Sequence, residues 1–348
     1  MDGMGITAFM QSSQNYGIKY EKTNVFYKNQ RIGPAAYVSG LFYVQERKYC
    51  YMPATQFICP DGKEVPILQC LRSCPQHQRC MFLPTLRAIA ASLHRDIAEP
   101  TVTELIAGVR ETYLKKTTDY AVNPQSVLYA LHGQGIHAIH EHCTQGEMLS
   151  EIRLRDTLTS GKFDLYGKIL DDDEGVLGDL KVTSSYKLMK ALGIYKVRVP
   201  TGELYKTGLR KGQPKYRNEL RYDGARHVLD WAMQLNYYRI LLEQEGFAVQ
   251  KMYIQAMCRD NNLRMAAERG IDQSVYIIPI RKISDRWLLR YFHRKAALLH
   301  EALKERKLPP ICSGRERWHD RKCLGYCAAR ANCPYAQRLQ REASGCVG

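Results

Sequence analysis

The 348-residue sequence has no apolar run as long as the ~18 residues of a membrane-spanning helix. Its first residues, Met1-Asp-Gly-Met-Gly-Ile, lack the basic stretch and the apolar run of a secretory signal. We therefore expect a soluble, cytoplasmic protein with no membrane partner. Thiols stay reduced in that compartment, so the twelve cysteines predict metal binding rather than disulfides.

The chain has fewer acidic than basic side chains: 35 Asp and Glu against 51 Lys and Arg, which gives a formal net charge of +16. At 45% hydrophobic residues the chain can still build a core, which excludes a disordered protein. A basic surplus of this size predicts a polyanionic partner, and nucleic acid is the usual one. The alternative is a basic protein without such a partner.

Two carboxylates and a lysine gather in the stretch Gly161–Lys181, which the pattern predicts to be two strands joined by a turn at residues 171–175. We expect Asp164 on the first strand. Asp179 and Lys181 lie two apart on the second strand and so share a face. The arrangement suits Mg²⁺ or Mn²⁺, with the lysine activating a water or stabilising a pentavalent phosphate. The alternative is an ordinary solvated strand edge.

Eight of the cysteines form two quartets with identical spacing, Cys-x10-Cys-x3-Cys-x5-Cys. Each cysteine of the second quartet follows its counterpart by 253 positions (312 − 59, for example). Four thiolates suit a tetrahedral Zn²⁺ site or an iron–sulfur cluster, and the alternative is a set of buried free thiols. The first quartet is Cys59, Cys70, Cys74 and Cys80; the second is Cys312, Cys323, Cys327 and Cys333.

Two predicted helices carry further candidates. The helix that opens at Pro124 contains His137, which could complete a metal site with Asp164 and Asp179; the alternative is a buried structural histidine. The amphipathic helix over residues 227–246 places Gln234 and Tyr238 on one face.

A basic insertion over residues 187–226 holds eleven Lys or Arg against three acids, with tyrosines interleaved. Basic side chains neutralise phosphates, and tyrosines can stack on unpaired bases. The alternative is a solvated surface loop. The predicted nucleic-acid-binding residues are Arg210, Lys211, Lys215 and Arg217.

These motifs together resemble the PD-(D/E)XK nuclease superfamily, in its RecB-like exonuclease branch, over roughly residues 120–260. The resemblance implies an α/β fold, a restriction-endonuclease-like core with a mixed sheet flanked by helices. It also implies that the histidine and two acids hold the metal, that the lysine acts in catalysis, and that the glutamine–tyrosine helix borders the active site and DNA. The matching residues are Gly133-x-x-x-His137-x-x-x-Glu141, Gly161-x-x-Asp164, Asp179-x-Lys181 and Trp231-x-x-Gln234-x-x-x-Tyr238.

Relatives in this branch, including the CRISPR-associated exonucleases, also hold an iron–sulfur cluster, with one cysteine before the nuclease core and three after it. This sequence has four on each side, and three residues rather than the more usual two between Cys323 and Cys327. Each quartet could hold its own Zn²⁺, or Cys80 could join Cys323, Cys327 and Cys333 around one cluster. The duplicated spacing favours two local sites.

The predicted organisation is an N-terminal segment over residues 1–57, a first four-cysteine module over 58–83, a nuclease core over 84–310, a second module over 311–335 and a polar tail over 336–348. The predicted function is a metal-dependent deoxyribonuclease, favoured as an exonuclease, in recombination, repair or mobile-element and defence processing, with DNA and proteins of those processes as partners. The alternative is an inactive nucleic-acid-binding protein with a nuclease-like fold and zinc-type modules.

Overall fold

The computed structural model describes residues 54–93, 99–146, 148–170, 174–223 and 228–345. The chain divides into two compact units, Met1–Lys48 and Tyr49–Gly348, and every described residue belongs to the second unit. The N-terminal segment expected over residues 1–57 therefore lies outside the described residues, apart from its last four positions. Among the helices of the described residues, none is long and apolar enough to cross a membrane.

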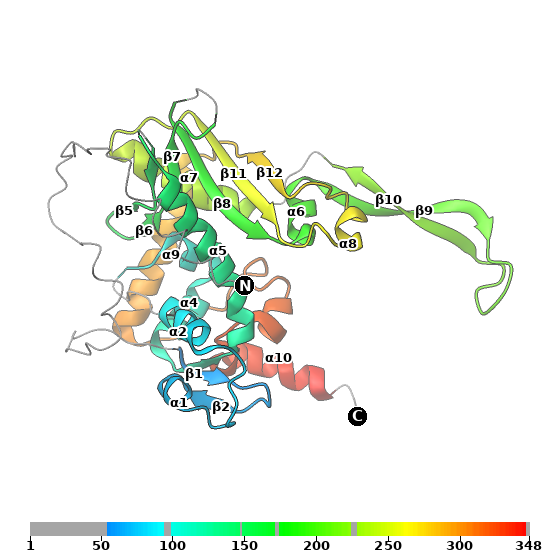
Figure 1. Ribbon diagram of the computed structural model, residues 1–348, viewed down its shortest axis with the longest axis horizontal. Coiled ribbons are helices and arrows are strands. Elements are labelled where there is room, and N and C mark those ends of the chain that lie inside the picture. The colour runs from blue at the N-terminus through cyan, green and yellow to red at the C-terminus, as the bar shows by residue number, and fades with distance from the viewer. Residues whose placement is uncertain (1–53, 94–98, 147, 171–173, 224–227, 346–348) are drawn as a thin grey trace, which may run out of the picture. The chain divides into compact units, whose positions relative to one another are not determined.

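A five-stranded mixed sheet forms the centre of the second unit (Figure 1), in the order β12-β11-β8-β7-β4. Strands β8 and β11 are parallel, and the other neighbouring pairs are antiparallel. The first five residues of β8 are all buried, as expected for a strand covered on both faces. The strands are β4 (Leu149–Ser150), β7 (Leu165–Gly167), β8 (Val176–Thr183), β11 (Lys251–Cys258) and β12 (Val275–Pro279).

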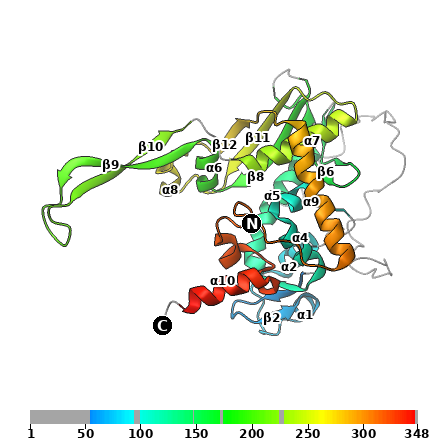
Figure 2. The ribbon, with the colours of Figure 1, turned by 180° about the vertical axis from the view of Figure 1, so that it is seen from behind.

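Helices pack against this sheet and against one another. Helix α7 (Leu229–Gln244) is almost wholly buried because it contacts β8 as well as α9 (Asp285–Glu305) (Figure 2). Helix α9 buries one stripe at four-residue steps, through Leu288, Phe292 and Ala296, as an amphipathic helix does. The mixed sheet with its helices agrees with the α/β part of the predicted fold class. The other helices of this layer are α3 (Val102–Ala107), α4 (Val109–Thr117), α5 (Pro124–Cys143), α6 (Ser185–Ala191) and α8 (Arg264–Ala267).

The first strand of the expected hairpin is broken in two. Strand β6 (Ser160–Lys162) pairs with β5 (Arg153–Arg155) in a separate two-stranded sheet, whereas β7 pairs with β8. Asp164 lies at the step between β6 and β7, so its predicted position on a strand is wrong. The physical reason is that the chain changes hydrogen-bonding partner there, which turns the Asp164 carboxylate toward β8.

The basic insertion is more ordered than a loop. After α6 the chain forms a two-stranded antiparallel sheet of β9 (Ile194–Leu204) and β10 (Pro214–Tyr222), which Figure 1 shows as a long ribbon. Within the described residues this ribbon pairs with no further strand. Hereafter it is called the arm.

The two cysteine segments belong to different hydrophobic clusters. The first lies on a small sheet, ordered β2-β1-β3, with a cluster built around Phe57, Ile67 and Leu86. The second packs on the main cluster, and the expected polar tail forms an amphipathic helix that continues from it. The elements are β1 (Ala54–Ile58), β2 (Glu64–Pro66), α1 (Ile67–Arg72), α2 (Leu83–Ser92) and β3 (Tyr120–Val122), then η3 (Lys322–Tyr326), η4 (Arg330–Asn332) and α10 (Pro334–Gly345).

Candidate active site

His137 enters the site from helix α5, whose start is well defined. Asn123 caps the helix, its side-chain oxygen accepting a hydrogen bond from Gln125 N at 2.9 Å, and Pro124 occupies the first turn. The cap fixes where the helix begins, and His137 follows nearly four turns later. There its half-buried imidazole lies against two carboxylates, one directly after β4 and one directly before β7.

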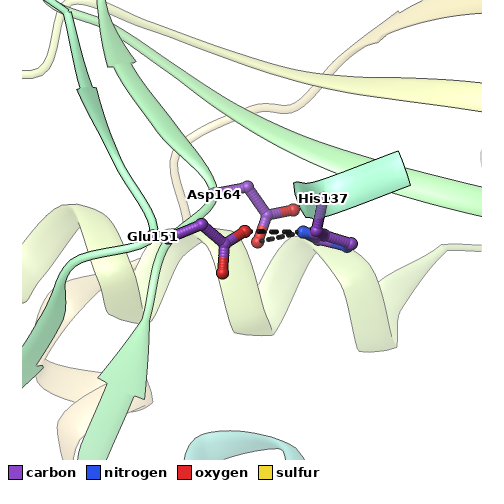
Figure 3. A group of neighbouring side chains, drawn as sticks. All are labelled: His137, Glu151 and Asp164. Atoms are coloured by element: carbon purple, nitrogen blue, oxygen red, sulfur yellow. Dashed lines mark hydrogen bonds and ion pairs between the residues drawn. The ribbon is translucent and has the colours of Figure 1, made fainter. Parts of the chain in front are cut away.

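His137, Glu151 and Asp164 bring one ligand atom each to within 4.8 Å of the others (Figure 3). His137 Nδ1 lies 2.7 Å from Glu151 Oε1 and 3.5 Å from Asp164 Oδ1. Of the three predicted metal ligands, His137 and Asp164 therefore come together, whereas Asp179 lies outside this group and Glu151 was missed.

Glu151 occupies an unusual backbone position directly after β4. Its φ is +54°, in the left-handed region, and its backbone N–H donates to the carbonyl oxygen of Asp164 at 3.0 Å. Its other carboxylate oxygen forms an ion pair with Lys162. Glu141, the acid of the matching sequence motif, is exposed and lies outside the group. In the sequence, Glu151 is only the first residue of Glu-Ile-Arg-Leu-Arg, a stretch of alternating polar and apolar residues ahead of Asp164.

Asp164 and Asp179 are both buried, with 6% and 1% of their surfaces exposed. Asp164 Oδ2 accepts a hydrogen bond from Leu180 N at 2.7 Å, which fixes the carboxylate against β8. Burial, together with the negative charge of Asp179, raises the pKa of Asp164 to about 7. The charge of Asp179 therefore disfavours the ionised form of Asp164, and a cation near both carboxylates would relieve the repulsion.

Lys181 and Asp179 share a face of β8 as predicted, and Lys181 Nζ lies 2.6 Å from Asp179 Oδ2. Asp179 is 1% exposed, so the Lys181 ammonium is the charged partner of this buried oxygen. Burial alone would lower the pKa of Lys181, but the charges of Asp179 and Asp164 outweigh it and raise the pKa. The ammonium is therefore charged in the resting site.

Gln234 and Tyr238 face this pair from α7, as their spacing predicted. Gln234 Nε2 donates to Tyr238 Oη at 2.9 Å and, more weakly, to Asp179 Oδ1 at 3.5 Å. Burial, with the charge of Asp179, raises the pKa of Tyr238 to about 12, so the phenol stays protonated. Gly161 makes room for this ring, because a Cβ there would lie 2.4 Å from Tyr238 Cε1.

The donor set fits a divalent cation. Carboxylate oxygens and an imidazole suit Mg²⁺ or, with the histidine, Mn²⁺. Asp179 lies near the three-residue group, and its negative charge adds to burial in raising the pKa of Asp164. The raised pKa of Asp164 also fits, since a bound cation would favour the ionised carboxylate.

The thiols of the first cysteine quartet are near neighbours. Burial, followed by the charges of Cys74, Cys80 and Cys59, raises the pKa of Cys70. Among the described residues, however, no three thiols approach one another as closely as the ligand atoms of the His137 group do. The predicted metal sites at both quartets therefore stay predictions.

The second quartet lines one cavity of about 30 Å³, which is large enough to hold a water molecule or a metal ion. Burial and the charge of Glu111 raise the pKa of Cys327 to about 11, so its thiol is neutral without a cation. Lys322 forms an ion pair with Glu111 at the cavity wall. The four cysteines that line the cavity are Cys312, Cys323, Cys327 and Cys333.

The four predicted nucleic-acid-binding residues all lie on the arm, in two different settings. Arg210 and Lys211 occupy its exposed turn. Lys215 is held by Glu203 at 3.0 Å, and Arg217 by Glu219 at 2.8 Å.

Comparison with known proteins adds little to this geometry. No protein-family model matches the sequence, and no curated protein is significantly similar to it. Among solved structures, the crystal structure of a "putative exonuclease" from Eubacterium rectale is similar to this chain with a TM-score of 0.25 and 12% sequence identity, over 68% of this chain and 79% of that one. A likeness this distant carries no argument, so the function is argued from the site.

Proposed function

We propose that the chain is a metal-dependent deoxyribonuclease of the PD-(D/E)XK type, which hydrolyses phosphodiester bonds. One observation carries the proposal: His137, Glu151 and Asp164 converge to within 4.8 Å near the ion pair of buried Asp179 and half-buried Lys181. Buried like charges are costly to hold together without a cation, so the arrangement is typical of a catalytic site rather than of a structural one.

His137, Glu151, Asp164 and Asp179 would hold Mg²⁺ or Mn²⁺. When bound, the ion supplies a polarised phosphoryl oxygen and a water of lowered pKa. Glu151 is already ionised in this setting, because the hydrogen bonds from His137 and Lys162 lower its pKa against the effect of burial. Asp164, by contrast, must lose its proton before it can act as a ligand.

Lys181 acts as a cation rather than as a base, since its pKa is raised and it has no tendency to give up its proton to Asp179. Its ammonium can donate hydrogen bonds to a phosphate oxygen as negative charge builds up there. Gln234 positions the pair through Asp179, and Tyr238 positions Gln234. Both residues lie on α7, which contacts β8, the strand that carries Asp179.

DNA is the proposed substrate, and the net charge of +16 supports a polyanionic partner. The resemblance to the RecB-like branch favours an exonuclease, in recombination, repair or defence against mobile elements. At the cysteines we propose two separate metal sites, with Zn²⁺ or an iron–sulfur cluster as occupant. The separate hydrophobic clusters beneath the two quartets support this over one shared cluster.

The test is incubation of the purified chain with linear and with covalently closed circular DNA, with Mg²⁺, with Mn²⁺ and with chelator. We expect cleavage that requires the metal and is lost in Asp179→Asn and Glu151→Gln. Glu141→Gln is the matched control, because it removes an exposed glutamate one turn after His137 that lies outside the group. Degradation of linear DNA alone would identify an exonuclease.

The alternative, a binding protein without turnover, gives a different result. It predicts that wild-type protein retains DNA without cutting it under any metal condition, and that Asp179→Asn binds DNA as the wild type does. That outcome would contradict the proposal.

A further inference from the structure

The arm contributes almost nothing to the core. Apart from Ile194 at its base, every residue of β9 and β10 is exposed or half-buried, so both faces of the ribbon meet solvent. Residues 194–222 contain eight Lys or Arg against two Glu. An isolated two-stranded ribbon of this charge has little to stabilise it by itself, which points to a polyanionic partner.

The pairing register sorts the side chains into two faces. In an antiparallel pair, directly opposed residues project to the same side. Arg198 opposes Asn218 and Pro200 opposes Tyr216, whereas Val199 opposes Arg217 and Val197 opposes Glu219. We call the side of Lys196, Arg198, Tyr216 and Asn218 the basic–aromatic face, and the side of Lys215, Arg217, Glu219 and Arg221 the paired face.

The cations of the paired face form ion pairs within the arm, three of them with two glutamates. Glu219 forms ion pairs with Arg217 at 2.8 Å and with Arg221 at 3.8 Å, and Glu203 forms one with Lys215 at 3.0 Å. Both glutamates of the arm are therefore engaged with the cations of this face. Exposed ion pairs add little stability, but they reduce the charge that this face offers to a partner.

The basic–aromatic face keeps its charge. Among the described residues, Lys196 and Arg198 form no ion pair, and both are exposed. The Arg198 guanidinium lies over the ring of Tyr216, 4.3 Å from its centroid, so cation and ring are presented together. Tyr216 itself is 43% exposed. Cations that neutralise phosphates beside a ring on which bases stack are the two components of a single-strand binding surface.

The turn at the end of the arm continues this chemistry. Leu209 is fully exposed and is followed directly by Arg210 and Lys211. An apolar side chain held in solvent among cations suits contact with base faces next to a phosphate backbone.

We propose that the basic–aromatic face of the arm binds a single-stranded stretch of nucleic acid, with Lys196 and Arg198 on phosphates and Tyr216 stacked on a base. This inference rests on the proposed function in one respect, that the chain acts on nucleic acid. It assigns the contact to one face of the arm. The main phosphate contacts are then Lys196 and Arg198 rather than Lys215 and Arg217, which form ion pairs with Glu203 and Glu219.

The experiment compares two double variants that remove the same charge, Lys196→Ala/Arg198→Ala and Lys215→Ala/Arg217→Ala. Both are made in full-length Asp179→Asn protein, and anisotropy measures binding to a labelled thymidine 30-mer in chelator across a salt series. We expect the first variant to lower the salt slope by ~1.4, at ~0.7 for each lost single-strand contact, and the second by less than half of that. Tyr216→Ser should weaken binding by about tenfold, and Tyr216→Phe, which keeps the ring, should not.

Equal losses in the two double variants would overturn the assignment to one face, and no loss in either would overturn the arm as a binding element. A labelled duplex of the same length that binds more tightly, with equal sensitivity to Tyr216→Ser, would overturn the single-strand assignment. Failure of the proposed function is separable: a wild-type chain that never cuts DNA, but whose binding depends on Lys196 and Arg198, refutes the nuclease alone.

Discussion

At the scale of single residues, the properties of the site depend on the burial of its charged side chains and on their effect on one another's pKa values. Asp164 and Asp179 are buried and Lys181 is half-buried. Burial and the charge of Asp179 raise the pKa of Asp164, and the charges of Asp179 and Asp164 raise that of Lys181 against the effect of burial. The charge of the Lys181 ammonium is therefore held by its two carboxylate neighbours.

Lys181→Ala should lower the rate of DNA cleavage by at least ~10²-fold, because the cation next to the reacting phosphate is lost. Binding of DNA and the far-ultraviolet circular dichroism spectrum should stay close to wild type. Lys168→Ala is the control. That lysine is exposed, forms an ion pair with Glu174, and follows β7, whereas Asp164 precedes this strand. Cleavage by Lys181→Ala at the wild-type rate would refute the catalytic assignment.

Asp164 should make the stability of the metal-free protein depend on pH. Its pKa in the folded state is about 7, against ~4 for an unperturbed aspartate, so the folded state binds the proton more tightly. The stability that this group contributes below about pH 4 is therefore lost as the pH rises through about 7. The side chain in Asp164→Asn cannot ionise. In chelator, the unfolding midpoint of this variant minus that of the wild type should therefore increase as the pH rises from about 4 to about 7.

Addition of Mg²⁺ at about pH 8 supplies the second part of the measurement. It should raise the unfolding midpoint of the wild type, because the ion favours the ionised carboxylate, and leave Asp164→Asn nearly unchanged. A constant difference between the two proteins from about pH 4 to 8 would contradict the coupling of Asp164 to Asp179.

At the scale of elements, the contact between β6 and α7 brings the two halves of the site together. Gly161→Ala should destabilise the fold by ~1–3 kcal/mol and reduce cleavage, because the new methyl group overlaps the Tyr238 ring. Gly135→Ala is the matched control: it lies within α5 with no atom within 4 Å of the added Cβ, and should stabilise by ~0.5–1 kcal/mol. Urea unfolding of both variants measures their free energies of unfolding. Equal values would contradict the prediction, because they would mean that the Tyr238 ring moves aside at no cost.

The elements also show what the sequence could predict. Spacing placed Asp179 with Lys181 on a strand face and Gln234 with Tyr238 on a helix face, since each face follows a fixed period. The resemblance to nuclease motifs added His137 and Asp164 to the same expected site. Glu151 could not be found in this way, because its left-handed backbone and its contact with His137 arise from tertiary packing. The step between β6 and β7 has the same origin. The strands of the arm were hidden by a composition rich in Gly and Lys, which is typical of loops.

At the scale of the whole molecule, the cysteine segments join parts of the chain that are distant in sequence. Asn332, next to Cys333, donates to Thr118 Oγ1 at 2.9 Å and to the Asp119 carbonyl oxygen at 2.7 Å, directly before β3 and α5. Lys322 forms an ion pair with Glu111 of α4. Bound metal at the second quartet would therefore stabilise the segment from which the His137 helix begins.

Cys74→Ser and Cys327→Ser should each lower the unfolding midpoint of protein purified without chelator, because metal bound to thiolates adds its binding energy to folding. Cys258→Ser is the control, since that buried cysteine belongs to neither quartet. Two zinc ions per chain without visible absorption would support closed local sites, and about four irons with brown colour would support a cluster. Protein that holds neither metal after anaerobic purification would refute both sites.

The base of the arm has a consequence for how such a chain can change over evolutionary time. Asp223 N donates to the Gly193 carbonyl oxygen at 3.1 Å, and the neighbouring residues Ile194 and Tyr222 are paired across the two strands. The chain thus leaves the body and returns to it at adjacent points, and a two-residue turn could close that gap. Insertions and deletions between these points would alter neither the central sheet nor the carboxylates. The length of the arm is therefore free to vary as an inherited trait, independently of the chemistry.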